Sequence, residues 1–184
     1  TNEPYAIAKI AGIKLCENYY RQYGDNFISV MPNNLYGPND NFDLETSHVL
    51  PALMRKFHEA KENNEKFVEI WGTGKALREF VYVDDLADAC VYLMKNLEAK
   101  YLLSKGISHI NIGSGLEVSI KNLSLLIKDI IGFEGDLIFN TNFPDGTPRK
   151  LLDSNRLEKL GFKKNTTLED GLYCTYEWYK KNIE

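Results

Sequence analysis

Residues 5–16 read Tyr-Ala-Ile-Ala-Lys-Ile-Ala-Gly-Ile-Lys-Leu-Cys, and residues 26–32 read Asn-Phe-Ile-Ser-Val-Met-Pro. The first stretch predicts a helix over Tyr5–Tyr23, because Pro4 suits the first turn of a helix and Gly24 suits its end. The second stretch predicts a short strand over Asn26–Met31, ended by a proline. Since the helix has no broad polar face, we expect cover on two sides, from a sheet and from a second subunit.

The rest of the chain continues to alternate between strand and helix patterns. Three of the predicted helices can be capped by Ser47, by Asp84 or Asp85, and by Ser119. A polar stretch rich in Asn, Gly and Pro over 33–45 predicts a long loop. The other predicted strands are 67–71, 79–83, 107–112 and 137–139, and the other predicted helices are 47–63, 84–96, 119–131, 154–160 and 168–181. This alternation predicts an α/β fold with a mainly parallel sheet.

The composition excludes several classes of protein. The 184 residues include 22 Lys and Arg against 26 Asp and Glu, with a net charge of −4, so we expect no nucleic-acid partner. No apolar run approaches the roughly 18–20 residues of a membrane span, and no signal-peptide pattern is present, so we expect no membrane association. Cysteines at 16, 90 and 174 and histidines at 48, 58 and 109 are dispersed, which predicts reduced cytoplasmic thiols and no metal site.

One unit that such an alternation usually includes is missing. No strand–GxGxxG–helix unit is present: Gly72-Thr73-Gly74 lacks the third glycine, and Gly113-Ser114-Gly115 lacks the acidic residue expected downstream. The strand that should precede the first helix is missing too. We therefore expect this chain to be the C-terminal part of a larger protein.

Tyr5 and Lys9 place a phenol and an ammonium group four residues apart, on one face of the first predicted helix. A cation beside a phenol stabilises the phenolate, as a general acid–base group at a carbonyl–alcohol couple requires. The pattern YxxxK is common by chance, however, and by itself it is more typical of a helix with one core tyrosine and one solvated lysine.

Several motifs follow this pair in a fixed order along the chain. They are Asn34-Leu35-Tyr36-Gly37-Pro38, Ser47-His48-Val49-Leu50-Pro51-Ala52-Leu53, Trp71-Gly72-Thr73-Gly74, Arg78-Glu79-Phe80-Val81-Tyr82-Val83-Asp84-Asp85, Ile110-Asn111-Ile112-Gly113-Ser114-Gly115 and Pro144-Asp145-Gly146-Thr147-Pro148-Arg149-Lys150. In this order they resemble the extended short-chain dehydrogenase/reductase family of nucleotide-sugar enzymes, over effectively the whole chain. The stretches 34–38, 47–53 and 144–150 are more narrowly similar to the GDP-L-fucose synthase branch of that family.

The resemblance implies an architecture. It implies the C-terminal part of a Rossmann-type parallel-sheet domain, which binds NADP, and a smaller α/β domain that binds a nucleotide sugar. Residues 1–36 would complete the Rossmann domain, and residues 37–184 would mainly form the substrate domain, with about 84–115 returning to the first. It also implies a homodimer, in which the helix Tyr5–Tyr23 packs on its symmetry mate.

The resemblance also implies a reaction: the NADPH-dependent 3,5-epimerisation and 4-reduction of GDP-4-keto-6-deoxy-D-mannose to GDP-L-fucose. The family's tyrosine at the position of Tyr5 protonates the C4 oxygen, and its lysine at the position of Lys9 binds the nicotinamide ribose. The residues that match the lining of the nicotinamide site are Pro32, Asn33, Asn34 and Leu35. His48 matches the family's epimerisation acid, which also contacts the cofactor; taken alone, it would be a capping or surface residue.

Four residues match the family's binding site for the nucleotide sugar: Lys56, Trp71, Arg78 and Asp145. An indole can stack on a base, a guanidinium group can fork onto phosphate oxygens, and a carboxylate can accept hydrogen bonds from hydroxyls. Lys56 stands where the family tends to have arginine, so bidentate geometry is lost there. Without the resemblance, Trp71 would be a core residue, Arg78 the partner of a nearby acid and Asp145 an ordinary turn residue.

Other functions stay open. Another nucleotide-sugar 4-epimerase or 4,6-dehydratase is one, although such an enzyme has no need of an epimerisation acid at His48. A non-catalytic fragment that binds substrate or forms dimers is another, because this chain lacks the glycine loop, the family's serine and its epimerisation cysteine. A structural α/β module would require all the motifs to fall in order by chance.

Overall fold

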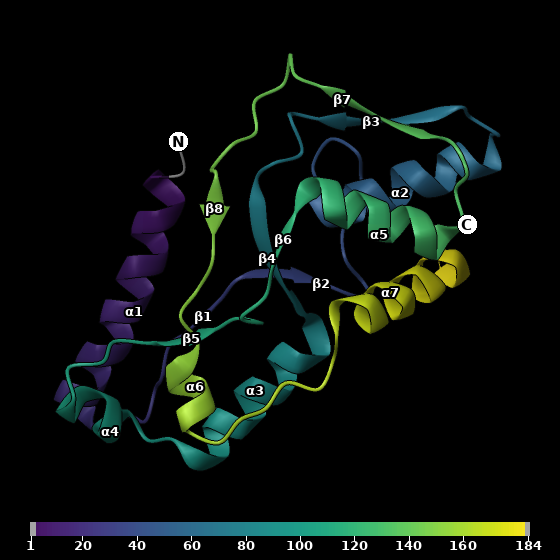
Figure 1. The fold of residues 1–184 in the computed structure, drawn as a ribbon. Coiled ribbons are helices and arrows are strands. Elements are labelled where there is room, and N and C mark those ends of the chain that lie inside the picture. The colour runs from purple at the N-terminus through teal and green to yellow at the C-terminus, as the bar shows by residue number, and fades with distance from the viewer. Residues whose placement is uncertain (1–2, 183–184) are drawn as a thin grey trace.

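A computed structural model of the chain describes residues 3–182 (Figure 1). This part of the chain forms seven helices and eight strands. The helices are α1 (Glu3–Tyr23), α2 (Val49–Glu62), α3 (Val83–Asn96), α4 (Ala99–Ser104), α5 (Ile120–Ile131), α6 (Asn155–Lys159) and α7 (Leu168–Asn182). The strands are β1 (Val30–Pro32), β2 (Asn34–Tyr36), β3 (Phe67–Trp71), β4 (Leu77–Tyr82), β5 (Ile110–Ile112), β6 (Glu117–Ser119), β7 (Asp136–Asn140) and β8 (Arg149–Lys150).

The strands pair mostly in parallel, as the sequence predicted. β1 pairs with β5, β2 with β4, and β3 with β7, each in parallel. The first residues of β4 also pair with β8 in parallel and with β6 in antiparallel orientation. The predicted α/β fold is confirmed, and β4 is the strand at which three others meet.

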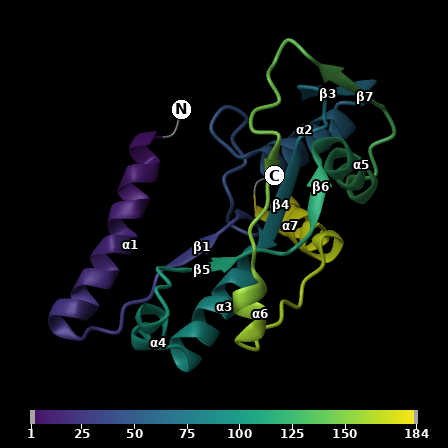
Figure 2. The same cartoon turned by 60° about the vertical axis from the view of Figure 1, so that its left-hand side comes forward.

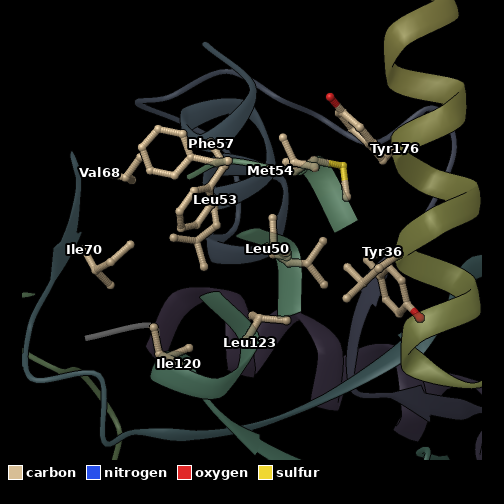
Figure 3. Packing of buried hydrophobic residues seen from close by; sticks show 14 of the residues in the cluster. Tyr36, Leu50, Leu53, Met54, Phe57, Val68, Ile70, Ile120, Leu123 and Tyr176 are labelled. Carbon is tan, nitrogen blue, oxygen red and sulfur yellow. The ribbon is translucent and has the colours of Figure 1, made fainter. Parts of the chain in front are cut away.

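Buried apolar side chains form two clusters, and β4 separates them. The first cluster fills the space between α2, α5, α7 and β3 (Figure 3). The second lies between α3, β5 and α6. Neighbouring residues of β4 belong to different clusters, Phe80 to the first and Val81 to the second, because successive side chains of a strand point to opposite faces. The domain boundaries predicted at residue 36 and near 84–115 stay predictions.

The predicted first helix is confirmed as α1, which stands at one side of the molecule (Figure 2). None of its residues 3–23 is buried, and Tyr5, Ile7 and Ile10 are 66%, 58% and 56% exposed. The cover that we expected on two sides of this helix therefore does not come from the described residues. Within residues 3–182, no helix combines the length and the apolar character needed to cross a bilayer.

Several predicted boundaries are wrong. The strand expected over Asn26–Met31 lies instead at β1, where three residues meet three residues of β5. The loop expected over 33–45 begins with the strand β2, because β4 offers that segment a parallel neighbour. The short elements α4, β6 and β8 were not predicted. The two strands consist of two or three residues and pair with the distant β4, a neighbour that local periodicity does not show.

The predicted caps were right at one helix and wrong at two. Ser119 caps α5, since its hydroxyl accepts a hydrogen bond from the Asn122 N–H at 3.1 Å. Ser47 does not cap α2, which begins after His48, and the Ser47 hydroxyl oxygen is buried without a hydrogen-bond partner.

Asp85 has a different role from the predicted cap. α3 already begins at Val83, so Asp85 lies within its first turn. The buried Asp85 carboxylate accepts hydrogen bonds from the N–H groups of Asn165 and Thr166, at 3.3 and 3.2 Å, and from the Thr166 hydroxyl at 3.1 Å. It thereby ties α3 to the segment that leads into α7.

Replacing Asp85 by Ala should lower the free energy of unfolding by about 2–4 kcal/mol, because the N–H groups of Asn165 and Thr166 would lose their acceptor. Asp84→Ala is the matched control, since Asp84 is exposed in the same helical turn and its loss should cost about 1 kcal/mol or less. Urea unfolding measures both changes. Equal losses in the two variants would contradict the tie and favour a shared role at the helix end.

Candidate functional site

The segment from residue 144 to residue 153, which we call the strap, runs beside β4 and includes β8 (Figure 1). Every side chain from 144 to 151 is exposed. Apolar burial therefore contributes little to the position of the strap, and hydrogen bonds must hold it. The strap carries one of the predicted substrate-binding residues, Asp145, and the adjoining strand β4 carries another, Arg78.

Arg78 holds the strap through backbone carbonyls. Its guanidinium group donates to the Thr147 oxygen at 2.6 Å, to the Leu77 oxygen at 2.8 Å and to the Asp145 oxygen at 3.5 Å. The side chain is half-buried, so the guanidinium group stands at the surface with its orientation fixed. A fixed guanidinium fork is the geometry that suits phosphate oxygens.

Asp145 is held from the other side by the turn after β3. Its carboxylate accepts hydrogen bonds from the Thr73 N–H and the Thr73 hydroxyl, both at 2.7 Å. The Thr73 hydroxyl, followed by the Thr73 N–H, keeps the pKa of the Asp145 carboxyl below its ordinary value. Gly72, with φ of 80°, leaves room for this contact, because a Cβ there would collide with the Asp145 carboxylate.

Trp71, at the end of β3, is partly exposed but has neighbours on its ring. The Phe143 ring stacks on it at 4.5 Å with an interplanar angle of 13°, and the Lys56 ammonium group lies 4.6 Å from the ring centroid. Burial lowers the pKa of Lys56, while nearby Glu69 opposes that shift. A nucleotide base can stack on this indole only if the Phe143 or Lys56 side chain moves off the ring.

These contacts bring the four predicted substrate-binding residues into one region, which we call the substrate cluster: Lys56, Trp71, Arg78 and Asp145. Trp71 reaches the strap through Phe143, which directly precedes it, and Arg78 reaches the strap at Asp145. Trp71 is 53% exposed, so it is not the core residue that it would be without the resemblance.

The predicted catalytic pair on α1 is exposed. The Lys9 ammonium group lies 5.2 Å from the centroid of the Tyr5 ring, so the two side chains share one helix face as predicted. Tyr5 is 66% exposed and is thus not a core tyrosine in residues 3–182. The structure does not bring this pair together with the substrate cluster, since α1 stands apart from α2 and β3 (Figure 2).

His48 directly precedes α2, and its side chain is exposed. It makes no capping hydrogen bond, so the capping role that it could have had alone is excluded. Asp40 lies near His48. Burial raises the pKa of the Asp40 carboxyl, while a hydrogen bond from the Asn41 N–H and the electrostatic influence of His48 oppose that rise. One Asp40 carboxylate oxygen is buried without a hydrogen-bond partner.

The predicted cofactor stretch continues from β1 into β2. Pro32 is exposed at the end of β1, whereas Leu35 is half-buried and packs against the second core cluster. Asn33 and Asn34 form a hydrogen-bonded turn between them, in which the Asn33 side-chain oxygen accepts from the Asn34 N–H at 2.9 Å. This turn ends beside Glu79 of β4, whose carboxylate accepts from the Asn33 amide.

Sequence reasoning missed Glu79 as a site residue. Its side chain is fully buried, although it stands next to Arg78 in the motif of residues 78–85. The available signal was a carboxylate directly before Phe80 and Val81, which both face core clusters. An acidic residue at such a position has to find hydrogen-bond donors inside the protein.

A cavity of about 580 Å³ opens between β4, β5, α6 and the segment before α7. Tyr82, Ser114, Leu157 and Phe162 are among its lining residues. None of the predicted site residues lines it, so it is separate from the substrate cluster. Among the described residues, no group of three or more His, Cys, Asp and Glu side chains could hold a metal ion.

A mainly parallel α/β fold is the architecture of open-sheet α/β proteins, which bind their ligands at the carboxyl ends of the strands. The chain belongs to the NAD dependent epimerase/dehydratase family, whose sequence profile matches residues 1–113.

The chain is similar to GDP-L-fucose synthase 1 of Arabidopsis thaliana, with 58% identity over 183 residues that cover 100% of this chain and 54% of the relative. GDP-L-fucose synthase of Escherichia coli K12 is 51% identical over 99% of this chain and 57% of its own length. A GDP-L-fucose synthetase of Naegleria fowleri, solved with NADP, is 32% identical with a TM-score of 0.89, covering 100% of this chain and 55% of the other. The chain thus spans about half the length of the curated relatives it matches.

Replacing Thr73 by Val should raise the pKa of the Asp145 carboxyl towards its ordinary value, because the hydroxyl donor would be lost. The carboxylate is charged at neutral pH in either case, but in the wild type the depressed pKa extends the charged form to lower pH, and the contact is lost only as the pH falls through that low pKa. Carbon NMR of the Asp145 carboxyl against pH measures the shift. Thr73→Ser is the control that keeps the hydroxyl, and identical titrations of the Val and Ser variants would contradict the assignment.

Proposed function

We propose that the protein, as its source produces it, catalyses the NADPH-dependent 3,5-epimerisation and 4-reduction of GDP-4-keto-6-deoxy-D-mannose to GDP-L-fucose. The observation that carries this proposal is the substrate cluster. Its four residues come from α2, β3, β4 and the strap, yet their contacts join them in one region. Relatives named GDP-L-fucose synthase, at 51% and 58% identity across the chain, support the same substrate.

The substrate cluster offers a matching group for each part of the GDP moiety. Arg78 and Lys56 supply two cations for the diphosphate, with Arg78 already oriented by its carbonyl partners. Trp71 supplies an aromatic face for guanine once Phe143 gives way. Asp145 supplies carboxylate oxygens for ribose or sugar hydroxyls, in addition to its bonds with Thr73.

The residues of this chain also fit NADP(H). Lys9 and Tyr5 are exposed on one face of α1, where an ammonium group and a phenol can reach the ribose hydroxyls of a bound dinucleotide. Pro32 and the Asn33–Asn34 turn lie at the C-terminal end of the parallel strand β1, which is the end where open α/β sheets bind their ligands. NADPH, when bound, supplies the hydride for reduction at C4.

The acid–base chemistry then falls to His48 and Tyr5. The protons at C3 and C5 are acidic because both carbons adjoin the C4 ketone, and inversion requires a proton donor on the face opposite to the base. His48 is the proposed donor, exposed at the start of α2, about 12 Å along the helix axis from Lys56. That span suits a diphosphate and a sugar ring. Tyr5 is the proposed proton donor to the C4 oxygen.

The homodimer and the location are part of the same proposal. The exposed apolar side chains of α1, among them Ile7 and Ile10, support a contact between two copies of this helix. Three free cysteines support a reducing, cytoplasmic setting.

The test uses the intact protein with GDP-4-keto-6-deoxy-D-mannose in deuterated water, with and without NADPH. The wild type should incorporate deuterium at C3 and C5 and oxidise NADPH. His48→Gln should slow deuterium incorporation by at least about a hundredfold, the lower end of a general acid–base contribution. Tyr5→Phe should keep deuterium incorporation and lose NADPH oxidation, because the two steps use different donors.

His109→Gln is the matched control, since His109 is a half-buried histidine that bonds Ser108 and lies outside the proposed site. It should retain both activities. A wild type that leaves this ketone without deuterium at C3 or C5, but inverts C4 of a nucleotide sugar that carries a C4 hydroxyl, would instead support a 4-epimerase. A wild type without any turnover would support a non-catalytic binding protein.

A further inference from the structure

The buried Glu79 carboxylate joins three segments that are distant in the sequence. It accepts hydrogen bonds from the Asn33 side-chain amide, from the Gly115 N–H at 2.6 Å and from the Leu152 N–H at 3.0 Å. These donors lie in the turn between β1 and β2, in the loop between β5 and β6, and in the strap. All three groups donate, so both carboxylate oxygens are used as acceptors.

This arrangement is costly if core stability is its only purpose. A carboxylate that leaves water for a protein interior loses its hydration, and an apolar side chain of similar volume often holds a core as well or better. The surroundings are shaped to fit it: a Cβ at Gly113 would lie 2.5 Å from a Glu79 carboxylate oxygen, so only glycine leaves enough room. An apolar side chain could fill the same space, but it could not accept three hydrogen bonds and so could not orient the three donor segments.

One of these bonds fixes the turn at which we expect the nicotinamide. With its amide nitrogen held by Glu79, the Asn33 side chain can turn its oxygen only towards Asn34, where it accepts from the N–H at 2.9 Å and from the side-chain amide at 3.1 Å. The Asn34 amide in turn donates to the Glu79 backbone oxygen at 2.8 Å. The side chains of Asn33 and Asn34, held by the carboxylate and the backbone oxygen of Glu79, therefore determine the shape of the turn.

Another bond fixes the strap, which carries Asp145. Leu152 is attached to the Glu79 side chain, and two positions earlier in β4 the Leu77 N–H donates to the Pro148 oxygen at 2.9 Å. Arg78, between them, holds the Thr147 oxygen. Three successive residues of β4 thus hold the strap along its length.

We propose that Glu79 is a positioning residue that holds the cofactor-facing turn and the nucleotide-binding strap in one fixed relation. The inference rests on the proposed function, because it takes NADP(H) for the turn and GDP for the strap. Loss of the carboxylate should therefore weaken the binding of both ligands, although Glu79 is buried and would act only through Asn33 and the backbone of the strap.

Calorimetric titration of the intact protein with NADP⁺ and, separately, with GDP tests the proposal. In Glu79→Gln one acceptor oxygen is replaced by a donor amide, and the affinity for each ligand should fall by about tenfold. Thr175→Val is the control for a buried hydrogen bond lost elsewhere, since the Thr175 hydroxyl donates only to the Gly171 oxygen within α7. It should change neither affinity by more than about twofold.

Asn33→Ala separates the effect on the turn from the effect on the strap. It should weaken the binding of NADP⁺ and change the affinity for GDP by no more than about twofold. If Glu79→Gln fails to fold, Glu79→Asp takes its place, because it keeps the charge but is one methylene too short to reach all three donors. A folded Glu79 variant that binds both ligands like Thr175→Val, or that loses only one of them, overturns the proposal. A wild type that binds neither ligand overturns the proposed function itself, a result that does not depend on any substitution.

Discussion

The carboxylate of Glu79 constrains how the turn after β1, the loop after β5 and the strap can lie relative to β4. Apolar packing fixes β4 itself, since Phe80 and Val81 enter different core clusters. Packing cannot fix the three loops, because their side chains are largely exposed or polar. Hydrogen bonds to one buried acceptor do so instead, and they impose directions as well as distances. The turn after β1, the loop after β5 and the C-terminal part of the strap therefore share one acceptor beside β4.

The strap is a segment that hydrogen bonds, and not apolar packing, hold in place. Its exposed side chains leave it without a core of its own, so it is held by discrete polar contacts, among them the two bonds of 2.7 Å from Arg149 to Glu117. A segment attached in this way keeps its backbone in place while its side chains stay free to rearrange around a ligand. Phe143, which stacks on Trp71 just before the strap, is the side chain whose place a base would have to take.

The long helices were predictable because their end signals or their periodicity are clear, Pro4 and Gly24 for α1 and the apolar spacing for α5: α1, α5 and α7 differ from the predictions by two residues or fewer at each end. The strand β2 and the hydrogen bonds of Asp85 were not predictable, because each depends on a partner that is far away in the sequence. The substrate cluster could be expected from motif order, and its residues do lie together. The role of Glu79 could not: its place directly before Phe80 and Val81 hints at burial, but only the folded chain supplies its three donors.

Amide hydrogen exchange, resolved by residue, in the wild type and in Glu79→Gln tests most directly whether the buried carboxylate holds these loops. The N–H groups of Gly115 and Leu152 lie in loops, yet both should exchange far more slowly than the N–H of Gly146 in the strap, and both should lose this protection together in the variant. Exchange of Gly115 and Leu152 at the rate of Gly146 in the wild type would contradict this role of Glu79. The loops around β4 would then be held by something other than the buried carboxylate.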